Sequence, residues 1–296
     1  MNILITGGTG LIGRALCRFW LQQGHQLTVW SRTPEKVAGL CGAQVRGIGQ
    51  LEQYAGELDA VVNLAGAPIA DRPWTAKRRQ LLWDSRITLT EQLVAWLATR
   101  QQQPQVLLSG SAVGWYGDGG ERQLDEQQPA VTSDFASLLC DAWESAALTA
   151  EVLGIRVVRI RTGLVLAAEG GFLQRLLLPF KLGLGGRIGS GKQWMPWIHL
   201  QDQIALIDFL LHHASASGPY NACAPQPVRN TDFTKTLGRT LHRPTLIPMP
   251  GMLLKLGLGE LAGLLLGGQR AVPKRLQEAG FEFRFKDLDR ALQALL

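Results

Sequence analysis

One short stretch of the sequence carries hydroxyl groups at positions suited to proton transfer. Ser109, Ser111 and Tyr116 follow the apolar run 106–108 within a few residues. In an open parallel sheet, ligands bind beyond the carboxyl ends of the strands. We therefore expect these side chains to lie beside the reacting part of a ligand, where they can hydrogen-bond a substrate hydroxyl or carbonyl group.

His199 is a further candidate for proton transfer, because an imidazole titrates near neutral pH. It follows Trp194 and Trp197, whose rings either stack on a ring or a base of a ligand or, as is commoner for aromatic residues, belong to the core. Two interpretations stay open. His199 is either a catalytic base or a hydrogen-bonded, half-buried histidine, and the second is the commoner use of such a residue.

The N-terminus has the pattern of a phosphate-binding turn. The apolar run 2–6 leads into the glycine loop 7–13, and residues 11–23 have apolar side chains at helical spacing. Glycines let the backbone approach a pyrophosphate, and the helix N-terminus offers free N–H groups to the anion. The alternative is a tight turn into a packed helix. We expect a dinucleotide cofactor to contact Gly7, Thr9, Gly10, Leu11, Ile12 and Gly13.

The end of the next expected strand, 27–30, indicates which dinucleotide is bound. A carboxylate at this edge would accept a hydrogen bond from the ribose 2′-hydroxyl of NAD. The sequence instead has Ser31 and Arg32, and the first acid is Glu35. Because these side chains can hold a 2′-phosphate, we expect NADP. The alternative is a solvated arginine in a turn before Pro34.

Further cofactor contacts are expected where later strands end. The apolar strand that starts at residue 58 ends in small residues, which leave room for a cofactor to pass. Arg86, on the expected helix 81–100, is either a ligand of the cofactor's phosphate or carboxamide or an ordinary surface charge. The contacts expected from these later segments are Leu64, Ala65, Gly66, Arg86, Ser109 and Leu164.

Strands and helices alternate along the first half of the chain. This predicts an α/β fold with a doubly wound parallel sheet of the Rossmann type. Beyond residue 166 the periodicity changes. We expect a cofactor-binding domain, 1–166, to which 198–223 returns, and a smaller substrate lobe made of 167–197 and 224–296.

Composition and charge narrow the class of protein. The 296 residues are 46% hydrophobic and carry a net charge of +6. This charge favours phosphate-bearing ligands, but the sequence lacks the basic blocks with interleaved aromatics that are typical of nucleic-acid grooves, so we expect no nucleic-acid partner. The four cysteines lie far apart, which predicts free core thiols, no metal site and a reducing compartment.

No signal-peptide pattern and no apolar run long enough to span a bilayer is found, so we expect a cytoplasmic protein without integral membrane association. Residues 252–266 are nevertheless very apolar, interrupted by Lys255, Glu260 and glycines. This segment is either a helix for a membrane surface or a partner, or a helix that covers the substrate lobe.

In order and spacing, these motifs resemble the extended short-chain dehydrogenase/reductase family, the branch of nucleotide-sugar epimerases and dehydratases. The matching segments are 6–13, 63–66, 109–117, 197–202 and 218–221. The segments 140–144, 185–191 and 280–283 resemble more narrowly the SDR39U1-like epimerase family proteins, an atypical subgroup. The resemblance implies that the chain binds NADP, that Ser111 is the catalytic serine, and that the substrate is a small molecule such as a nucleotide sugar. We consider a homodimer as its assembly.

The sequence departs from the family at the proton shuttle. The family uses a Tyr-x-x-x-Lys pair, in which the lysine lowers the pKa of the tyrosine and holds the ribose. None of the three tyrosines has a lysine four residues later, and the matching positions hold Ala136 and Cys140. The usual mechanism therefore cannot be carried over. Tyr116 can shuttle a proton, but we expect no activating cation beside it.

Two functions are consistent with these observations. The first is an NADP-dependent oxidoreductase or epimerase that acts on a small, anionic substrate in a crevice lined by Ser111, Tyr116, Trp197 and His199. The second is a non-catalytic NADP-binding redox sensor or scaffold, which the loss of the tyrosine and lysine pair favours. Turnover of a substrate would separate the two.

Overall fold

A seven-stranded parallel sheet forms the centre of the computed structural model, which describes residues 1–131 and 134–296. The strand order is β11-β7-β5-β4-β1-β2-β3, and each neighbouring pair is parallel. This arrangement confirms the predicted doubly wound Rossmann sheet. The strands are β1 (Asn2–Thr6), β2 (Gln26–Trp30), β3 (Arg46–Ile48), β4 (Ala60–Asn63), β5 (Val106–Ala112), β7 (Arg156–Thr162) and β11 (Gly218–Ala222).

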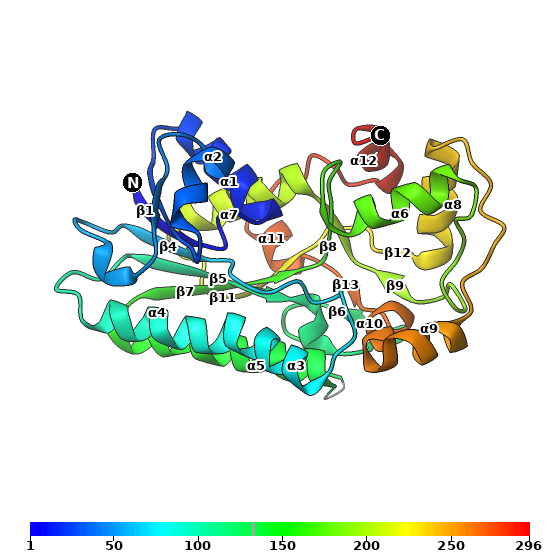
Figure 1. Ribbon diagram of the computed structural model, residues 1–296, viewed down its shortest axis with the longest axis horizontal. Helices are drawn as coiled ribbons and strands as arrows, with labels where there is room; N and C mark the ends of the chain where they lie inside the picture. Colours follow the sequence, from blue (N-terminus) through cyan, green and yellow to red (C-terminus); the bar gives the residue numbers. More distant parts are fainter. Residues whose placement is uncertain (132–133) are drawn as a thin grey trace.

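Helices cover both faces of the sheet (Figure 1). One face carries α1 (Leu11–Gln22), α2 (Val37–Cys41) and α7 (Leu200–His212). The other carries α3 (Ala76–Trp83), α4 (Leu89–Ala98) and α5 (Phe135–Leu148). Because the central strands are buried on both sides, their sequences are continuous apolar runs rather than alternating ones.

The expected helix 81–100 is interrupted. α3 ends at Trp83, a π-helical segment, η3, covers Asp84–Thr88, and α4 begins at Leu89. A π turn inserts an extra residue into a helix and often marks a functional site. Arg86 lies within this turn.

The rest of the chain forms a smaller layer beside the sheet (Figure 1). Its short strands pair as β8 (Leu164–Leu166) with β10 (Trp197–His199), β9 (Trp194–Met195) with β12 (Val228–Arg229), and β6 (Gln123–Leu124) with β13 (Arg270–Ala271). The helices are α6 (Gly171–Lys181), α8 (Asn230–Thr240), α9 (Gly251–Leu258), α10 (Ala262–Leu266), α11 (Lys274–Glu278) and α12 (Leu288–Gln293). The 3-10 turn of this layer is η6 (Gly259–Leu261), between α9 and α10. The other 3-10 turns belong to the main domain: η1 (Pro34–Lys36), η2 (Leu51–Gln53), η4 (Val113–Tyr116) and η5 (Thr149–Leu153).

We call 167–197 and 224–296 the C-terminal lobe. Its own apolar cluster includes Leu173, Trp197, Phe233 and Leu292. Between the two parts of the lobe the chain returns to the main sheet, where β11 pairs with β7. The use of this lobe for a substrate stays a prediction.

The cysteines and the hydropathy of the helices add two facts. All four cysteines are free and buried. Within the two described ranges, no helix combines the length and the apolar character needed to cross a bilayer.

Candidate cofactor and active site

Glycines fix the loop between β1 and α1. Gly7 has a φ of +68°, and a Cβ atom there would lie 2.5 Å from the carbonyl oxygen of Leu64. A Cβ atom at Gly13 would lie 2.4 Å from the carbonyl oxygen of Gly7. Since no larger residue fits at either position, the loop packs tightly against the end of β4 and against the first turn of α1.

The N-terminus of α1 is open to a ligand. Gly10 is the N-cap and is exposed, while Thr9, Leu11 and Ile12 are partly exposed. Among the described residues, no side chain caps the first turn, and this turn contains no acid. Its free N–H groups and the positive end of the helix dipole therefore suit an anion. These features fit the diphosphate of a dinucleotide.

Buried polar side chains hold the end of β4 in place. The Thr6 hydroxyl donates to Asn63 Oδ1 at 2.6 Å, and the Asn63 amide donates to Thr90 Oγ1 at 2.7 Å. The backbone N–H of Ala65 donates to Thr6 Oγ1 at 3.1 Å. This network sets the path of Leu64, Ala65 and Gly66 beside the glycine loop. Sequence analysis did not single out Thr6 or Thr90, although both are polar residues within apolar surroundings.

Ser31 and Arg32 lie just beyond β2. The Ser31 hydroxyl accepts a hydrogen bond from the Thr33 N–H at 3.2 Å, and the Ser31 N–H donates to the Ile48 carbonyl at 2.9 Å. Arg32 is exposed, and none of the residues in the described ranges hydrogen-bonds its guanidinium. The end of β2 therefore offers a hydroxyl and a free cation.

Arg86 is built into the wall beside Gly66. Its guanidinium donates to the carbonyls of Ala67 at 2.9 Å and of Leu82 at 3.2 Å, and lies 5.4 Å from the Trp143 ring centre. A Cβ atom at Gly66 would lie 2.9 Å from this guanidinium. Burial lowers the pKa of Arg86 to about 10. Because this value is still well above neutral pH, the guanidinium stays charged. The side chain is thus a fixed cation at the strand ends.

Ser111 belongs to a buried ionic network. Its hydroxyl donates to Glu144 Oε1 at 2.7 Å. The same carboxylate accepts from Arg161 Nε at 2.8 Å and Nη2 at 3.0 Å, and from Arg159 Nη1 at 3.0 Å. Only 2% of the surface of Glu144 is exposed. Because the Ser111 hydroxyl donates its hydrogen bond to Glu144, the lone pairs of the Ser111 oxygen remain free to accept a hydrogen bond from a ligand.

Glu144 lies one turn beyond the positions of the missing tyrosine and lysine. Ala136, Cys140 and Glu144 are four residues apart and so share one face of α5. A Cβ atom at Gly114 would lie 4.0 Å from Ala136 Cβ and 3.9 Å from Cys140 Sγ, so this face meets the loop after β5. Sequence analysis missed Glu144 and Arg161. The signal available was an acid on the buried face of a helix and an arginine in a buried strand.

Tyr116 is fully buried and hydrogen-bonded inside the protein. Its hydroxyl oxygen lies 2.9 Å from Asn221 Oδ1 and 3.0 Å from the Asp125 carbonyl oxygen, and its one proton is donated to either acceptor. Burial raises its pKa to about 12, and Arg161 opposes this shift. The expectation that no cation lies near Tyr116 is wrong, because the Arg161 guanidinium is 5.0 Å from its ring centre. The contacts give Tyr116 a structural role, and its catalytic role stays a prediction.

His199 caps helix α7. Its Nδ1 accepts a hydrogen bond from the Gln201 N–H at 3.1 Å, and its ring stacks on Phe285 at 3.8 Å. Burial, together with the charge of Arg284, lowers its pKa to about 4. In the described part of the chain, Nε2 has no hydrogen-bond partner. These contacts favour a buried neutral histidine, and a catalytic role stays a prediction.

The remaining candidate site residues differ in how far they are buried. Ser109 is fully buried, and its hydroxyl lies 3.4 Å from the Asn63 amide. Trp197 is fully buried and donates to the Gln226 carbonyl, which favours the core interpretation of this residue over stacking on a ligand. Trp194 is partly exposed, and the guanidinium groups of Arg229 and Arg270 lie 4.6 Å and 4.9 Å from its ring centre. Leu164 is half-buried at the start of β8.

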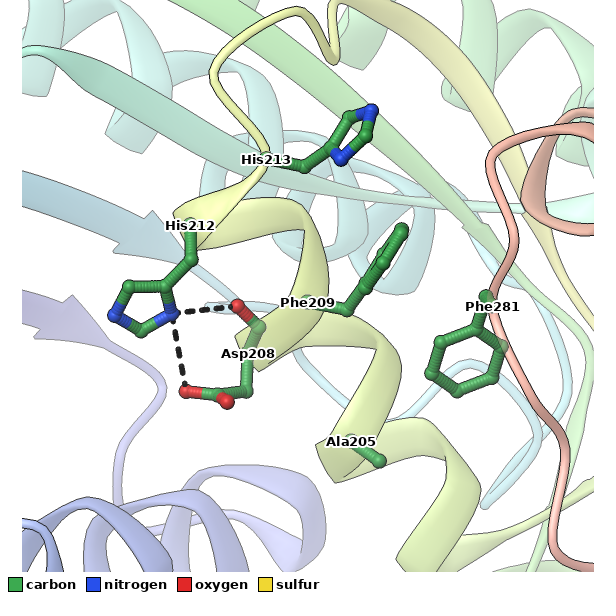
Figure 2. A pocket seen from close by; sticks show the side chains of 6 residues that line it. All are labelled: Ala205, Asp208, Phe209, His212, His213 and Phe281. Carbon is green, nitrogen blue, oxygen red and sulfur yellow. Dashed lines mark hydrogen bonds and ion pairs between the residues drawn. The ribbon is translucent and has the colours of Figure 1, made fainter.

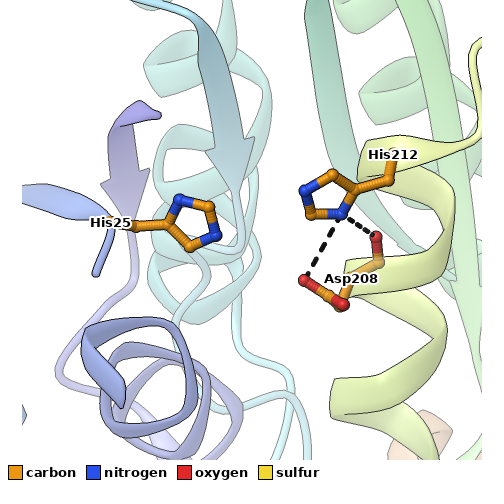
Figure 3. A group of neighbouring side chains, drawn as sticks. All are labelled: His25, Asp208 and His212. Atoms are coloured by element: carbon orange, nitrogen blue, oxygen red, sulfur yellow. Dashed lines mark hydrogen bonds and ion pairs between the residues drawn. The ribbon is translucent and has the colours of Figure 1, made fainter. Parts of the chain in front are cut away.

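Another polar cluster lies at the opposite edge of the sheet. His25 precedes β2, and Asp208 and His212 lie near the end of α7 (Figure 3). The ligand atoms of these three side chains all lie within 4.8 Å of one another. Within the ranges that the structure describes, this is the group of three or more histidine, cysteine and acidic side chains that could hold a metal ion. However, Asp208 Oδ1 already accepts from Trp20 Nε1 at 2.7 Å, and His212 Nδ1 lies 2.9 Å from the Asp208 carbonyl.

The surface beside this cluster is a hollow along α7 (Figure 2). Phe209 lies between His213 and Phe281, at ring-centre distances of 5.0 Å and 5.5 Å. The cluster and the hollow are far from the carboxyl ends of the strands, where a dinucleotide binds. The packing of α7 on α1 brings Asp208 to Trp20 and His212 to His25.

Comparison with known proteins identifies two matching regions. Residues 3–223 match the NAD dependent epimerase/dehydratase family, and residues 249–295 match DUF1731, a domain of unknown function. The epimerase family protein YfhF of Bacillus subtilis is 37% identical over 100% of this chain and 98% of its own. The epimerase family protein ML0860 of Mycobacterium leprae is 40% identical over 98% of this chain and 94% of its own.

Two solved structures resemble this chain over nearly its whole length. The structure of human epimerase family protein SDR39U1 with NADPH has a TM-score of 0.88 and 32% identity, and covers 100% of this chain and 99% of that one. UDP-glucuronic acid 4-epimerase from Bacillus cereus, in complex with UDP-glucuronic acid and NAD, has a TM-score of 0.79 at 16% identity, over 99% of this chain and 97% of that one, and shares the fold alone. The resemblance expected from the motifs is confirmed. The chain belongs to the NAD dependent epimerase/dehydratase family.

Proposed function

We propose that the protein is an NADP-dependent oxidoreductase or epimerase. One observation carries the proposal: the open N-terminus of α1 and its glycine loop lie beside a strand end that has Ser31 and Arg32 but no acid before Glu35. The NADPH in the human relative supports the same cofactor. Thr9, Gly10, Leu11 and Ile12 hold the diphosphate, and Arg32 with Ser31 holds the 2′-phosphate.

Bound NADP supplies a nicotinamide ring that accepts or donates hydride. The chain's own residues bind and orient the reactants. Ser111 accepts a hydrogen bond from the substrate hydroxyl, because Glu144 fixes the direction of the serine proton. Arg86 provides a positive charge near Gly66 on the side where the family's lysine is replaced by Cys140. Tyr116 and His199 hold the surrounding elements in place.

The substrate we propose is a small anionic molecule, with nucleotide sugars as the first class to test. The net charge of +6 and the fixed cation at Arg86 support an anion. We place the reaction in the cytoplasm, in keeping with four free buried cysteines.

Turnover tests this function directly. The purified protein is incubated with NADPH or NADP and a panel of carbonyl compounds and nucleotide sugars. A reductase changes the nicotinamide absorbance, whereas an epimerase gives a new sugar without net change of the cofactor. Ser111→Ala should weaken either signal about a hundredfold while NADPH binding stays. Binding without turnover across the panel would contradict a catalytic function.

The alternative is a non-catalytic NADP-binding redox sensor or scaffold. A specific observation favours it: the face of α5 that should carry the tyrosine and lysine carries Ala136 and Cys140, and Tyr116 is buried. A sensor should bind NADPH without consuming it and should co-purify with a partner in one redox state of the cofactor.

A further inference from the structure

The C-terminal lobe has an exposed apolar edge. Sixteen large apolar side chains are exposed in the described part of the chain, and nine of them lie in the segments 178–184 and 246–256. The most exposed of these nine are Leu246, Met252 and Leu256, with relative exposures of 83%, 82% and 85%. Exposed apolar side chains gathered in this way indicate a surface that binds a protein or a membrane.

The segments that carry these side chains lie side by side. Ile188 pairs with Met249, whose N–H donates to the Arg187 carbonyl at 2.8 Å. Arg243 Nε donates to the Lys181 carbonyl at 2.8 Å. In Figure 1, α6, α8 and α9 form the end of the molecule farthest from β1. The apolar side chains therefore belong to one edge.

The lobe does not use α9 for its own core. Every residue of α9 is at least partly exposed. The apolar cluster of the lobe is built instead from β8, β9, β10, α6, α8 and α12. A surface helix normally buries its apolar stripe, so α9, with apolar side chains at five of its eight positions, presents a face that requires a partner.

Charge indicates the kind of partner. Residues 170–201 and 233–259 contain eight lysines and arginines and no aspartate or glutamate, although the whole chain has 24 acidic residues. Cations interleaved with leucine and methionine suit the boundary of an anionic bilayer. The acids next to these segments are already paired, Glu260 with Arg79 and Asp289 with Arg239. Two copies of the chain would bring the cationic segments together, which disfavours a symmetric dimer here. Residues 241–259 also lack phenylalanine, tyrosine and tryptophan, the usual anchors of protein interfaces.

We propose that this edge docks the protein on an anionic membrane surface. Met252, Leu253 and Leu256 enter the headgroup boundary, and Lys181 and Lys255 remain at the level of the lipid phosphates. The association is peripheral and reversible. If the proposed function holds, this association brings the NADP-dependent site next to a membrane.

Flotation with vesicles tests this surface on the full chain. Vesicles with about 30% phosphatidylserine are compared with pure phosphatidylcholine vesicles. The protein should float with the anionic vesicles only, and high salt should release it. The double variant M252S/L256S should bind at least about tenfold more weakly, and K181Q and K255Q about fivefold each. V152S is the matched control, because Val152 is 89% exposed on η5, outside the edge.

Three results would overturn the proposal. The wild-type protein stays with the soluble fraction at low salt, or M252S/L256S floats as well as V152S, or the double variant instead dissociates a dimer in light scattering. Circular dichroism and thermal unfolding establish that each variant is folded. NADPH binding by every variant separates this surface from the cofactor site.

Discussion

At the scale of single residues, Glu144 connects Ser111, the candidate catalytic residue, to two arginines of the sheet. It holds the Ser111 hydroxyl and two arginines within a buried network. Burying charges is unfavourable unless each is paired, so removal of one partner leaves the others uncompensated. The same carboxylate therefore affects both stability and the direction of the serine proton.

Glu144→Gln keeps the shape of the side chain and removes its charge. We expect the free energy of unfolding to fall by about 3 kcal/mol, because Arg159 and Arg161 lose their counter-charge. Urea denaturation measures this loss. Glu151→Gln is the control, because Glu151 is exposed, and it should change stability by less than about 0.5 kcal/mol. Equal stability of the two variants would contradict the role of the network.

Ser111→Ala removes the group proposed to contact substrate. We expect kcat/KM to fall about a hundredfold, as for the loss of a positioned proton-transfer group. The Kd for NADPH should stay within about twofold of the wild-type value, because Ser111 is not a proposed cofactor ligand. Steady-state kinetics and calorimetry measure the two quantities. Loss of cofactor binding together with activity would show that Ser111 supports the fold instead.

His199 predicts a pH dependence of stability. Burial first, and then Arg284, depress its folded pKa to about 4 from the ordinary 6.5. As the pH falls below the ordinary pKa, His199 is protonated in the unfolded state but stays neutral in the folded state. The free energy of unfolding therefore decreases on acidification between the two pKa values. The loss is at most about 3 kcal/mol.

His199→Asn removes this titration while its amide oxygen still caps α7. Urea denaturation from about pH 7 to about pH 4 should show a steeper loss for the wild-type protein than for the variant. His212→Gln, on the exposed end of α7, is the control and should follow the wild-type curve. Parallel curves for wild type and His199→Asn would show that His199 is protonated as readily in the folded state.

At the scale of elements, much of the fold could be predicted because its signals are local. Apolar periodicity located the main strands, and the glycine turn located the first helix. The π turn at Asp84–Thr88 could not be predicted, because one inserted residue hardly changes helical periodicity. The pairing of Ser111 with Glu144 depends on how α5 lies on β5 and β7, which no local pattern reveals. The burial of Trp197 likewise depends on the core of the C-terminal lobe.

The glycine loop offers a substitution that separates binding from folding. A Cβ atom at Gly10 would meet only the Gly7 carbonyl, at 3.2 Å, and Gly10 is exposed. Gly10→Val should therefore fold, with a loss of stability of about 1 kcal/mol, but its side chain should block the diphosphate. We expect NADPH affinity to fall at least about tenfold in calorimetry. Gly39→Ala in α2 meets open space and is the control.

At the scale of the whole molecule, the proposed active site and the proposed membrane surface lie at different edges. The carboxyl edge of the sheet gathers the glycine loop, Arg32, Arg86 and Ser111, while the far edge of the C-terminal lobe carries the apolar and cationic surface of α9. The lobe has a core of its own, so changes at its outer edge should leave the cofactor site intact. Cofactor binding and membrane docking can therefore be measured independently.

The most direct test of the central claim is calorimetric titration of the wild-type protein with NADPH and with NADH. We predict one site, with NADPH bound at least about tenfold more tightly than NADH, and loss of this preference in Arg32→Gln. Tighter binding of NADH, or binding of neither coenzyme by the folded protein, would contradict the account.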